Sequence, residues 1–305
     1  MEKYNLANHF FTIFTPTYNR GYIIQTLFNS LLRQSYKNFE WLIVDNGTKS
    51  IEGQVNLFRS KANFPIKYIK TDKKGINRAF NDNVNLADGD LFFKVDDDDY
   101  LTDDALAILN TTFNSIKNKH KIAGVSGLRK HENGEIIGGE WVNKSDFVDA
   151  TNFERVKYGL SGDKAECYYT DVIKDNLPFP EYEGEDYTDE SILYNRIADK
   201  GYKLRWINKA IYCTEYLEDG TTKNLSQKLY ENPKTYNYLV NQRIGFDEIN
   251  EIEKIKLVCR YLEMCRKRNI RKKEAEENLN YSRSLFNVCW YLSSLTKLFP
   301  RREIK

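Results

Sequence analysis

Four consecutive carboxylates, Asp96–Asp99, follow directly after the apolar segment Leu91–Val95. Four adjacent negative charges repel one another and destabilise a fold unless positive charge neutralises them. A hard divalent cation does this through oxygen ligands, and Mg²⁺ or Mn²⁺ typically also takes phosphate oxygens from a substrate. We therefore predict that Asp96 and Asp98 contact a metal ion or a ribose. For Asp99 the pattern predicts only a solvated acidic turn.

Two further polar clusters also follow strand-like segments. They are Thr15–Arg20 and Asp45–Thr48. Open α/β sheets bind ligands at the carboxyl ends of their parallel strands, so three clusters at such ends predict one ligand site. The sequence contains no phosphate-binding loop of the P-loop or dinucleotide type and no serine nucleophile elbow. It therefore lacks the main motifs of P-loop proteins, dinucleotide-binding proteins and serine hydrolases with such an elbow.

The elements that must position these clusters alternate along the first 130 residues. Strands are predicted at Phe10–Thr15, ended by Pro16, and at Trp41–Val44, Ile66–Ile69, Leu91–Val95 and Ala123–Ser126. Helices are predicted around Ile24–Leu32, at Ala79–Leu86, and from an N-cap at Thr102 to Ile116 with Asp103 and Asp104 in the first turn. This order predicts an α/β fold with a mainly parallel sheet covered on both faces.

Composition narrows the class of protein. The 305 residues contain 41% hydrophobic and 30% charged residues, which argues against bulk disorder. The longest apolar runs, Ala105–Leu109 and Val288–Leu292, are far shorter than the roughly 20 residues of a spanning helix. The N-terminus lacks the features of a signal peptide. Five cysteines without a C-x-x-C spacing predict reduced thiols and a cytoplasmic location.

Charge is distributed unevenly: residues 254–305 carry a net charge of +9 and residues 1–253 carry −7. Two apolar patterns at helical spacing flank the basic segment Arg266–Lys273; they are Ile252, Ile255, Cys259, Leu262 and then Leu285, Val288, Leu292, Leu295, Phe299. Two interpretations stay open for these predicted helices. Either they pack on the rest of the chain with a solvated basic face, or they attach to an anionic membrane surface. No nucleic-acid partner is predicted, because no aromatic residues interleave with the basic ones.

Four collinear strings resemble the family 2 glycosyltransferases of the GT-A fold. They are FTPTYNR (Phe14–Arg20), LLRQSYKNFEWLIVDNGT (Leu31–Thr48), KGINRAFN (Lys74–Asn81) and ADGDLFFKVDDDDY (Ala87–Tyr100). The resemblance covers roughly the first 130 residues. It implies a GT-A type α/β fold and an inverting, metal-dependent transferase that uses a nucleotide-diphosphate sugar, with a UDP-sugar favoured.

The resemblance also implies roles for single residues. The first loop, with Thr15, Pro16, Tyr18 and Arg20, and the following turn, with Asp45 and Asn46, would hold the nucleotide; Asn81, Asp96 and Asp97 would contribute as well. Asp98, with Asp96, would bind the divalent Mn²⁺ or Mg²⁺. Two positions depart from the family pattern, because Asn46 replaces an aspartate and Phe80 replaces an arginine.

The catalytic base is predicted in the acidic string EGEDYTDE (Glu183–Glu190). The string Thr188–Leu204 resembles a family variant in which an arginine follows the base by six residues, and counting back from Arg196 gives Glu190. Asp189 lies beside it and Asp186 is the competing candidate. A purely structural role at the positive end of a helix stays open for Asp189 and Glu190.

The expected architecture is a GT-A catalytic domain over residues 1–225 and a basic helical region over 226–305. Within the domain, residues 1–130 would bind the nucleotide sugar and 131–225 the acceptor. The expected acceptor is a saccharide or a polyprenyl-linked saccharide in cell-surface polysaccharide synthesis, and the expected location is cytoplasmic, including the cytoplasmic face of the membrane. Two alternatives stay open: a sugar nucleotidyltransferase, and a nucleotide-sugar-binding protein without turnover.

Overall fold

The chain divides into two compact units. The computed structural model describes residues 7–117, 121–214 and 224–294. The first unit comprises Met1–Pro178 and Arg196–Tyr216, and the second comprises Phe179–Asn195 and Leu217–Lys305. The segment 179–195 thus groups with the C-terminal helices, although the predicted domain boundary lies after residue 225.

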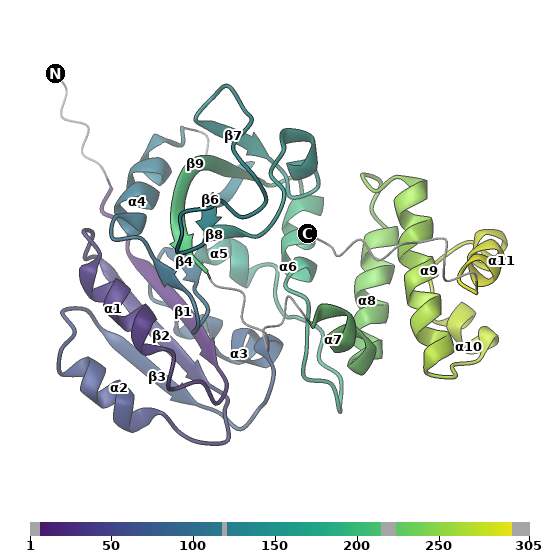
Figure 1. Cartoon of the computed structure of the whole chain (residues 1–305), viewed down its shortest axis with the longest axis horizontal. Helices are drawn as coiled ribbons and strands as arrows, with labels where there is room; N and C mark the ends of the chain where they lie inside the picture. Colours follow the sequence, from purple (N-terminus) through teal and green to yellow (C-terminus); the bar gives the residue numbers. More distant parts are fainter. Residues whose placement is uncertain (1–6, 118–120, 215–223, 295–305) are drawn as a thin grey trace. The chain divides into compact units, whose positions relative to one another are not determined.

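A nine-stranded mixed sheet forms the first unit, with the order β3-β2-β1-β4-β8-β6-β9-β5 and β7 paired to β9 (Figure 1). The strands are β1 (Phe11–Thr17), β2 (Phe39–Asp45), β3 (Ile66–Lys70), β4 (Leu91–Lys94), β5 (Tyr100–Leu101), β6 (Ile122–Lys130), β7 (Phe147–Ala150), β8 (Lys164–Tyr169) and β9 (Lys203–Cys213). Strands β3, β2, β1 and β4 are parallel, β8 runs antiparallel between β4 and β6, and β9 is parallel to β6. The predicted α/β fold with a mainly parallel sheet is therefore confirmed.

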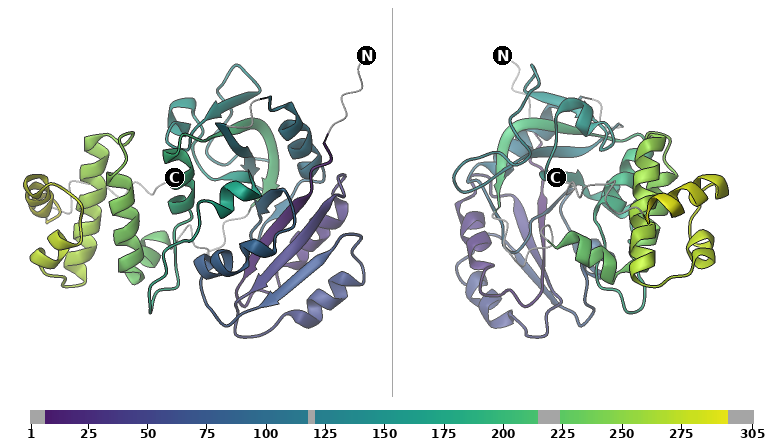
Figure 2. Two further views of the ribbon diagram at one scale, coloured as in Figure 1. Left: turned by 180° about the vertical axis from the view of Figure 1, so that it is seen from behind. Right: turned by 45° about the vertical axis from the view of Figure 1, so that its right-hand side comes forward.

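Helices cover both faces of this sheet, as the front and back views show (Figures 1 and 2). The helices are α1 (Gln25–Arg33), α2 (Glu52–Arg59), α3 (Ile76–Asn83), α4 (Ala105–Ser115) and α5 (Thr170–Lys174). Successive strand side chains point to opposite faces. Phe11 and Ile13 of β1 therefore join the core formed with α1, α2 and α4, whereas Phe14 lies 4.7 Å from Phe80 of α3, measured between ring centroids.

Three predicted boundaries are wrong in the first unit. Strand β1 continues through Pro16, because the nitrogen of Pro16 faces β4, and β4 pairs with β1 only up to Phe14. Helix α4 begins at Ala105, and Thr102 bonds to the side chain of Asp104 (3.0 Å) instead of capping the helix. The predicted helix at 79–86 begins earlier, at Ile76, and ends in a 3₁₀ turn, Val84–Leu86.

Helices make up the described part of the second unit apart from its loops. They are α7 (Leu225–Glu231), α8 (Pro233–Ile244), α9 (Glu251–Lys267), α10 (Lys272–Glu277) and α11 (Arg283–Leu292), with the first residues of α6 (Ser191–Asp199). Helices α9 and α11 confirm the two predicted helices, around 252–262 and from 285; Leu295 and Phe299 lie outside the described residues. The predicted apolar faces are wrong in part, because 66% of Ile252 and 50% of Val288 are exposed. No helix within the described ranges is long and apolar enough to span a membrane.

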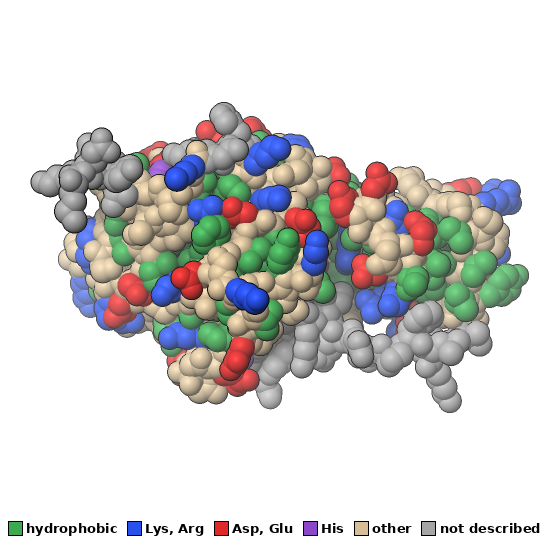
Figure 3. Space-filling view, turned by 90° about the horizontal axis from the view of Figure 1, so that it is seen from above, with side chains coloured by type: hydrophobic (Ala, Val, Ile, Leu, Met, Phe, Trp, Pro, Cys, Tyr) green, Lys and Arg blue, Asp and Glu red, His purple; other side chains and the backbone are tan. Residues whose placement is uncertain are grey.

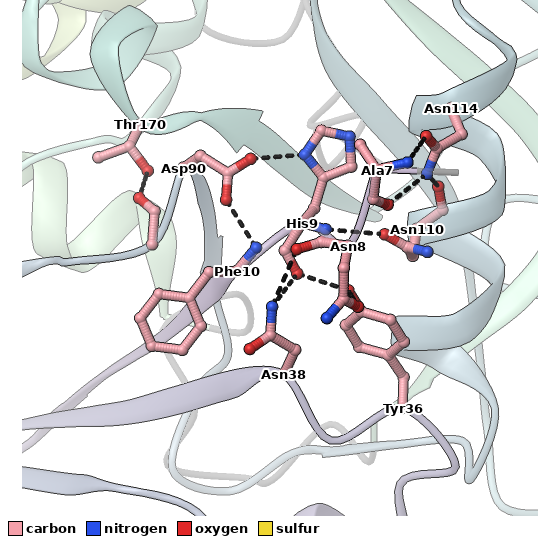
Figure 4. A network of polar contacts seen from close by, with 11 residues as sticks. Ala7, Asn8, His9, Phe10, Tyr36, Asn38, Asp90, Asn110, Asn114 and Thr170 are labelled. Atoms are coloured by element: carbon pink, nitrogen blue, oxygen red, sulfur yellow. Dashed lines mark hydrogen bonds and ion pairs between the residues drawn. The ribbon is translucent and has the colours of Figure 1, made fainter. Parts of the chain in front are cut away.

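A polar network fixes the entry into β1 (Figure 4). His9 Nδ1 lies 2.5 Å from Asp90 Oδ2, and the Phe10 amide donates to Asp90 Oδ1 at 2.6 Å. The side chain of Asn38 donates to the His9 carbonyl, and the His9 amide donates to Asn110 of α4. Asp90 thereby joins the start of β1 to the start of β4.

Replacing Asp90 with alanine is expected to lower the free energy of unfolding by about 1–2 kcal/mol, because two hydrogen bonds to a half-exposed carboxylate are lost. Urea denaturation measures the change. Asp72→Ala is the matched control, because the Asp72 carboxylate is fully exposed and should change stability by less than about 0.5 kcal/mol. Equal losses in both variants would show that the network contributes nothing.

Candidate functional site

The loop after β1 contacts the acidic turn after β4. Thr17 is buried and its hydroxyl donates to Asp97 Oδ2 at 2.6 Å. Arg20 Nη1 lies 2.6 Å from Asp98 Oδ2 and 3.6 Å from Asp97 Oδ1. The structure therefore brings together two of the three predicted clusters at the carboxyl edge of the sheet.

Asn19 joins the same loop to the third cluster. Its side-chain oxygen accepts hydrogen bonds from the Thr48 amide (2.8 Å), the Thr48 hydroxyl (3.1 Å) and the Lys49 amide (3.4 Å). Its φ of 58° is left-handed, a conformation that asparagine adopts more readily than most residues. The predicted cluster Thr15–Arg20 includes Asn19 without a role for its side chain, and the available signal is an asparagine within a polar loop. Gly47 lies against this residue, since a Cβ there would come within 2.7 Å of the Asn19 nitrogen.

Replacing Asn19 with alanine is expected to lower the free energy of unfolding by about 1–2 kcal/mol, because the loop loses its acceptor and alanine is strained at positive φ. Asn19→Gly should cost less, since glycine tolerates the backbone conformation. Denaturation gives the free energies, and hydrogen exchange at the Thr48 amide reports the loop itself. Unchanged exchange in both variants would contradict this role of Asn19.

The turn after β2 is built on Asp45, which is fully buried. Asp45 Oδ1 accepts from the Gly47 amide (2.9 Å), and Oδ2 accepts from the Tyr68 hydroxyl (2.6 Å) and the Ile51 amide (3.2 Å). The neighbouring Asn46 is also buried and donates to the Gly75 carbonyl at 3.2 Å. These contacts give both side chains a structural role in the turn, and their contact with a nucleotide stays a prediction.

Each carboxylate of the acidic turn has a partner within the first unit. Lys94 Nζ lies 2.7 Å from Asp96, the Thr17 hydroxyl donates to Asp97, and Arg20 pairs with Asp98. Asp99 accepts from the Thr214 hydroxyl and lies 3.5 Å from Arg129. The expected solvated turn at Asp99 is wrong, because only 4% of Asp99 is exposed.

Burial and neighbouring charges shift the acidity of these four groups in different directions. Burial raises the pKa of Asp97 and of Asp99 to about 7 in each case. Burial, with the charge of Asp96, also raises the pKa of Asp98. Burial by itself would also raise the pKa of Asp96. The positive charges of Lys94 and Arg129 outweigh this effect, so the pKa of Asp96 is lowered. Asp96 is therefore held as the anion.

Two residues without a predicted role, Arg129 and Tyr212, contact each other beside this turn. The guanidinium of Arg129 stacks on the ring of Tyr212 at 4.1 Å, and the Tyr212 hydroxyl accepts from the Asp96 amide at 3.0 Å. Arg129 also donates from Nε to the Lys164 carbonyl at 2.8 Å. These groups come from β6, β9 and β8, and no local pattern in the sequence signals that they meet.

The donor set suits a cation that shares its coordination with a substrate. The exposed fraction is 30% for the Asp96 side chain, 17% for Asp98 and 7% for Asp97, so Asp96 and Asp98 are the more accessible. No cluster of three or more His, Cys, Asp or Glu in the described ranges could enclose a metal ion. Mg²⁺ is commonly bound by one or two carboxylates together with substrate phosphates, so these two residues fit such an ion.

The remaining predicted residues of the first unit lie on its loops and on α3. Tyr18 is 38% exposed, and Lys74 Nζ lies 5.2 Å above its ring. Thr15 is buried and accepts from the Trp41 indole at 3.0 Å. Asn81 is half-buried on α3. Phe80 is a core residue that packs on Phe14, which explains why an apolar side chain is stable there.

The candidates for the catalytic base belong to the second unit. Glu190 Oε2 accepts from the Tyr194 hydroxyl at 2.9 Å, and Asp189 Oδ1 accepts from the Ser191 amide at 2.9 Å at the start of α6. The Asp186 amide donates to Asn232. Glu185 accepts from the Lys234 and Thr235 amides at the start of α8, a structural role.

Part of the chain matches the model of a known protein family. The family model described as "Glycosyl transferase family 2" matches residues 12–135. The chain is 38% identical over 104 residues to the abequosyltransferase RfbV of Salmonella typhimurium, which is 33% of this chain and 31% of that protein. It is 24% identical over 224 residues to a GalNAc(5)-diNAcBac-PP-undecaprenol beta-1,3-glucosyltransferase of Campylobacter jejuni, 72% of this chain and 69% of that protein. The chain thus spans about a third of the length of the first relative.

Solved structures share the fold over nearly the whole chain. Residues 1–349 of S. aureus TarS in complex with UDP-GlcNAc align with a TM-score of 0.59 at 18% identity, covering 94% of this chain and 91% of that one. A mannosyltransferase from Pyrobaculum calidifontis in complex with GDP-Man and Mn²⁺ aligns with a TM-score of 0.55 at 15% identity, covering 96% and 81%. These alignments confirm the predicted GT-A fold.

Proposed function

We propose that the protein transfers a sugar from a nucleotide-diphosphate donor to a hydroxyl group of a saccharide or lipid-linked saccharide, because residues 12–135 match the model of glycosyl transferase family 2. The observation that carries the proposal is the joining of three strand-end loops by Thr17–Asp97, Arg20–Asp98 and Asn19–Thr48. Such an edge is where open α/β sheets bind ligands. A UDP-sugar is the favoured donor, and the undecaprenol-linked saccharide in the name of the Campylobacter jejuni relative supports a lipid-linked acceptor.

The donor would lie against the loops of the first unit. The exposed ring of Tyr18 is available for stacking on a base, and Thr15, Pro16, Arg20, Asp45, Asn46, Asn81, Asp96 and Asp97 surround or support that position in our proposal. Asp98, with Asp96, would hold a divalent cation. When bound, that cation neutralises charge on the leaving diphosphate.

Glu190 is our proposed general base, with Asp189 beside it and Asp186 as the competitor. A free alcohol is a poor nucleophile at neutral pH, so a carboxylate that accepts its proton in the transition state accelerates the attack. The hydrogen bond from the Tyr194 hydroxyl orients Glu190 Oε2. A single displacement at the anomeric carbon inverts its configuration.

We also propose that a surface of the second unit contacts an anionic membrane peripherally. Lipid-linked acceptors would be presented at the surface of that membrane. Arg266 stacks on Trp290 at 4.0 Å, and Lys272 lies 5.4 Å from the Tyr291 ring, which is 68% exposed. Hydrophobic side chains lie on this unit's surface among Lys, Arg, Asp and Glu (Figure 3). Aromatic and basic side chains together favour the membrane interface. Co-sedimentation with vesicles that contain anionic lipid, against neutral vesicles, tests the contact.

Hydrolysis of a panel of nucleotide sugars with Mn²⁺ or Mg²⁺ tests the transferase proposal. Slow release of one nucleoside diphosphate would identify the donor. Binding of that donor without hydrolysis or transfer to any acceptor would favour a binding protein without turnover. Absence of binding to every donor with either metal would refute the proposal.

A further inference from the structure

Arg20 forms an ion pair with Asp98, the first candidate for a metal ligand. Its Nη1 is 2.6 Å from Asp98 Oδ2 and 3.6 Å from Asp97 Oδ1. A quarter of the Arg20 side chain is exposed, against 17% of Asp98. The pair is thus partly desolvated, so its attraction exceeds that of a fully exposed ion pair.

A divalent cation bound to Asp98 would compete with the Arg20 guanidinium for the lone pairs of the Asp98 carboxylate. A carboxylate oxygen that accepts a short charge-assisted hydrogen bond is a weaker metal ligand, and two cations a few ångströms apart repel each other. The neighbouring acidic side chains already have partners of their own. Asp96 is paired with Lys94, and Asp97 accepts a hydrogen bond from the Thr17 hydroxyl. Metal binding at Asp98 therefore requires Arg20 to move or to give up part of its contact.

Resting on the function proposed above, we propose that Arg20 and the divalent cation compete for Asp98, and that Arg20 transfers to the donor diphosphate when the cation binds. The planar guanidinium presents paired donors that match phosphate oxygens. Arg20 has this alternative partner because it lies on the loop that begins directly after β1, at the proposed donor site. Cation and nucleotide would then each strengthen the binding of the other, and this coupling is reciprocal.

Direct Mn²⁺ binding without nucleotide tests the competition. Arg20→Gln is expected to bind Mn²⁺ roughly tenfold more tightly than the wild type, measured by calorimetry or by the electron paramagnetic resonance signal of free Mn²⁺. The same variant should bind UDP more weakly at saturating Mn²⁺, and the gain in UDP affinity that Mn²⁺ produces should be smaller than in the wild type, because only the coupling through Arg20 is lost. Lys73→Gln is the matched control, because it also removes one positive charge from the first unit but pairs with the exposed Asp82. Its Mn²⁺ affinity should change less than twofold.

Equal or weaker Mn²⁺ binding by a folded Arg20→Gln would overturn the proposal, and so would an equal gain in the Lys73 control. If Arg20→Gln does not fold, Arg20→Lys serves instead. It keeps the charge and loses the paired donors, so Mn²⁺ affinity should stay near that of the wild type while UDP binds more weakly. Unchanged UDP affinity in that variant would also overturn the proposal. A wild type that binds neither Mn²⁺ nor any nucleotide would refute the proposed function itself.

Discussion

Replacing Asp98 with asparagine should reduce sugar transfer by about 10³-fold or more. The change keeps the shape of the side chain but removes the anionic ligand proposed to hold the divalent cation. Loss of one preorganised electrostatic contact in a transferase site costs on the order of 10²–10³ in kcat, and loss of the cation affects the leaving diphosphate directly. Release of nucleoside diphosphate, measured across a range of Mn²⁺ concentrations, gives both kcat and the metal requirement.

Asp103→Asn is the matched control for this experiment. Asp103 lies five positions after Asp98 and its exposed carboxylate pairs with Arg33 at 2.9 Å, so its removal should change kcat less than twofold. Recovery of the Asp98 variant at high Mn²⁺ would show that only metal affinity is impaired. Full activity of Asp98→Asn at low Mn²⁺ would refute the metal-binding role.

Replacing Glu190 with glutamine should reduce transfer by about 10²–10⁴-fold and leave donor binding within twofold of the wild type. Glutamine accepts the Tyr194 hydrogen bond through its amide oxygen, so local structure should persist, but a neutral amide cannot take the proton of the acceptor hydroxyl. Transfer to a saccharide acceptor and donor binding by calorimetry are the two readouts.

Two further variants separate the candidates for the base. Glu183→Gln changes an exposed glutamate of the same acidic string and should have no effect on transfer. Asp186→Asn is the decisive comparison. An inactive Asp186→Asn together with an active Glu190→Gln would assign the base to Asp186 and show that counting back from Arg196 selected the wrong carboxylate.

Local pattern was sufficient to predict the elements that bear the first three clusters. Alternating strand and helix signals depend on neighbouring residues, so β1, β2, β4 and their polar ends could be located from the sequence. The predicted end of β1 at Pro16 is wrong for a non-local reason. A proline is tolerated at this position of β1 because the pairing with β4 stops at Phe14. The Thr102 cap was wrong because a side-chain partner, Asp104, replaced the expected backbone amide.

Contacts between distant segments could not be predicted. Arg129, Tyr212 and Thr214 meet Asp96 and Asp99 only because β6 and β9 are neighbours in the sheet. The grouping of residues 179–195 with the C-terminal helices likewise depends on packing between segments far apart in the sequence, such as Glu185 with the start of α8. A single sequence carries no signal of such pairings.

The position of β8 has a consequence for any attempt to isolate the segment that matches the family model, residues 12–135. Strand β4 is paired on one side with β1 and on the other with β8, where Leu91 faces Tyr169 and Phe93 faces Cys167. The family match ends at residue 135, before β8 begins. A fragment cut at that point would expose the backbone groups of an apolar edge strand, which invites self-association. The nascent chain has the same exposed edge on the ribosome until residues 164–169 emerge.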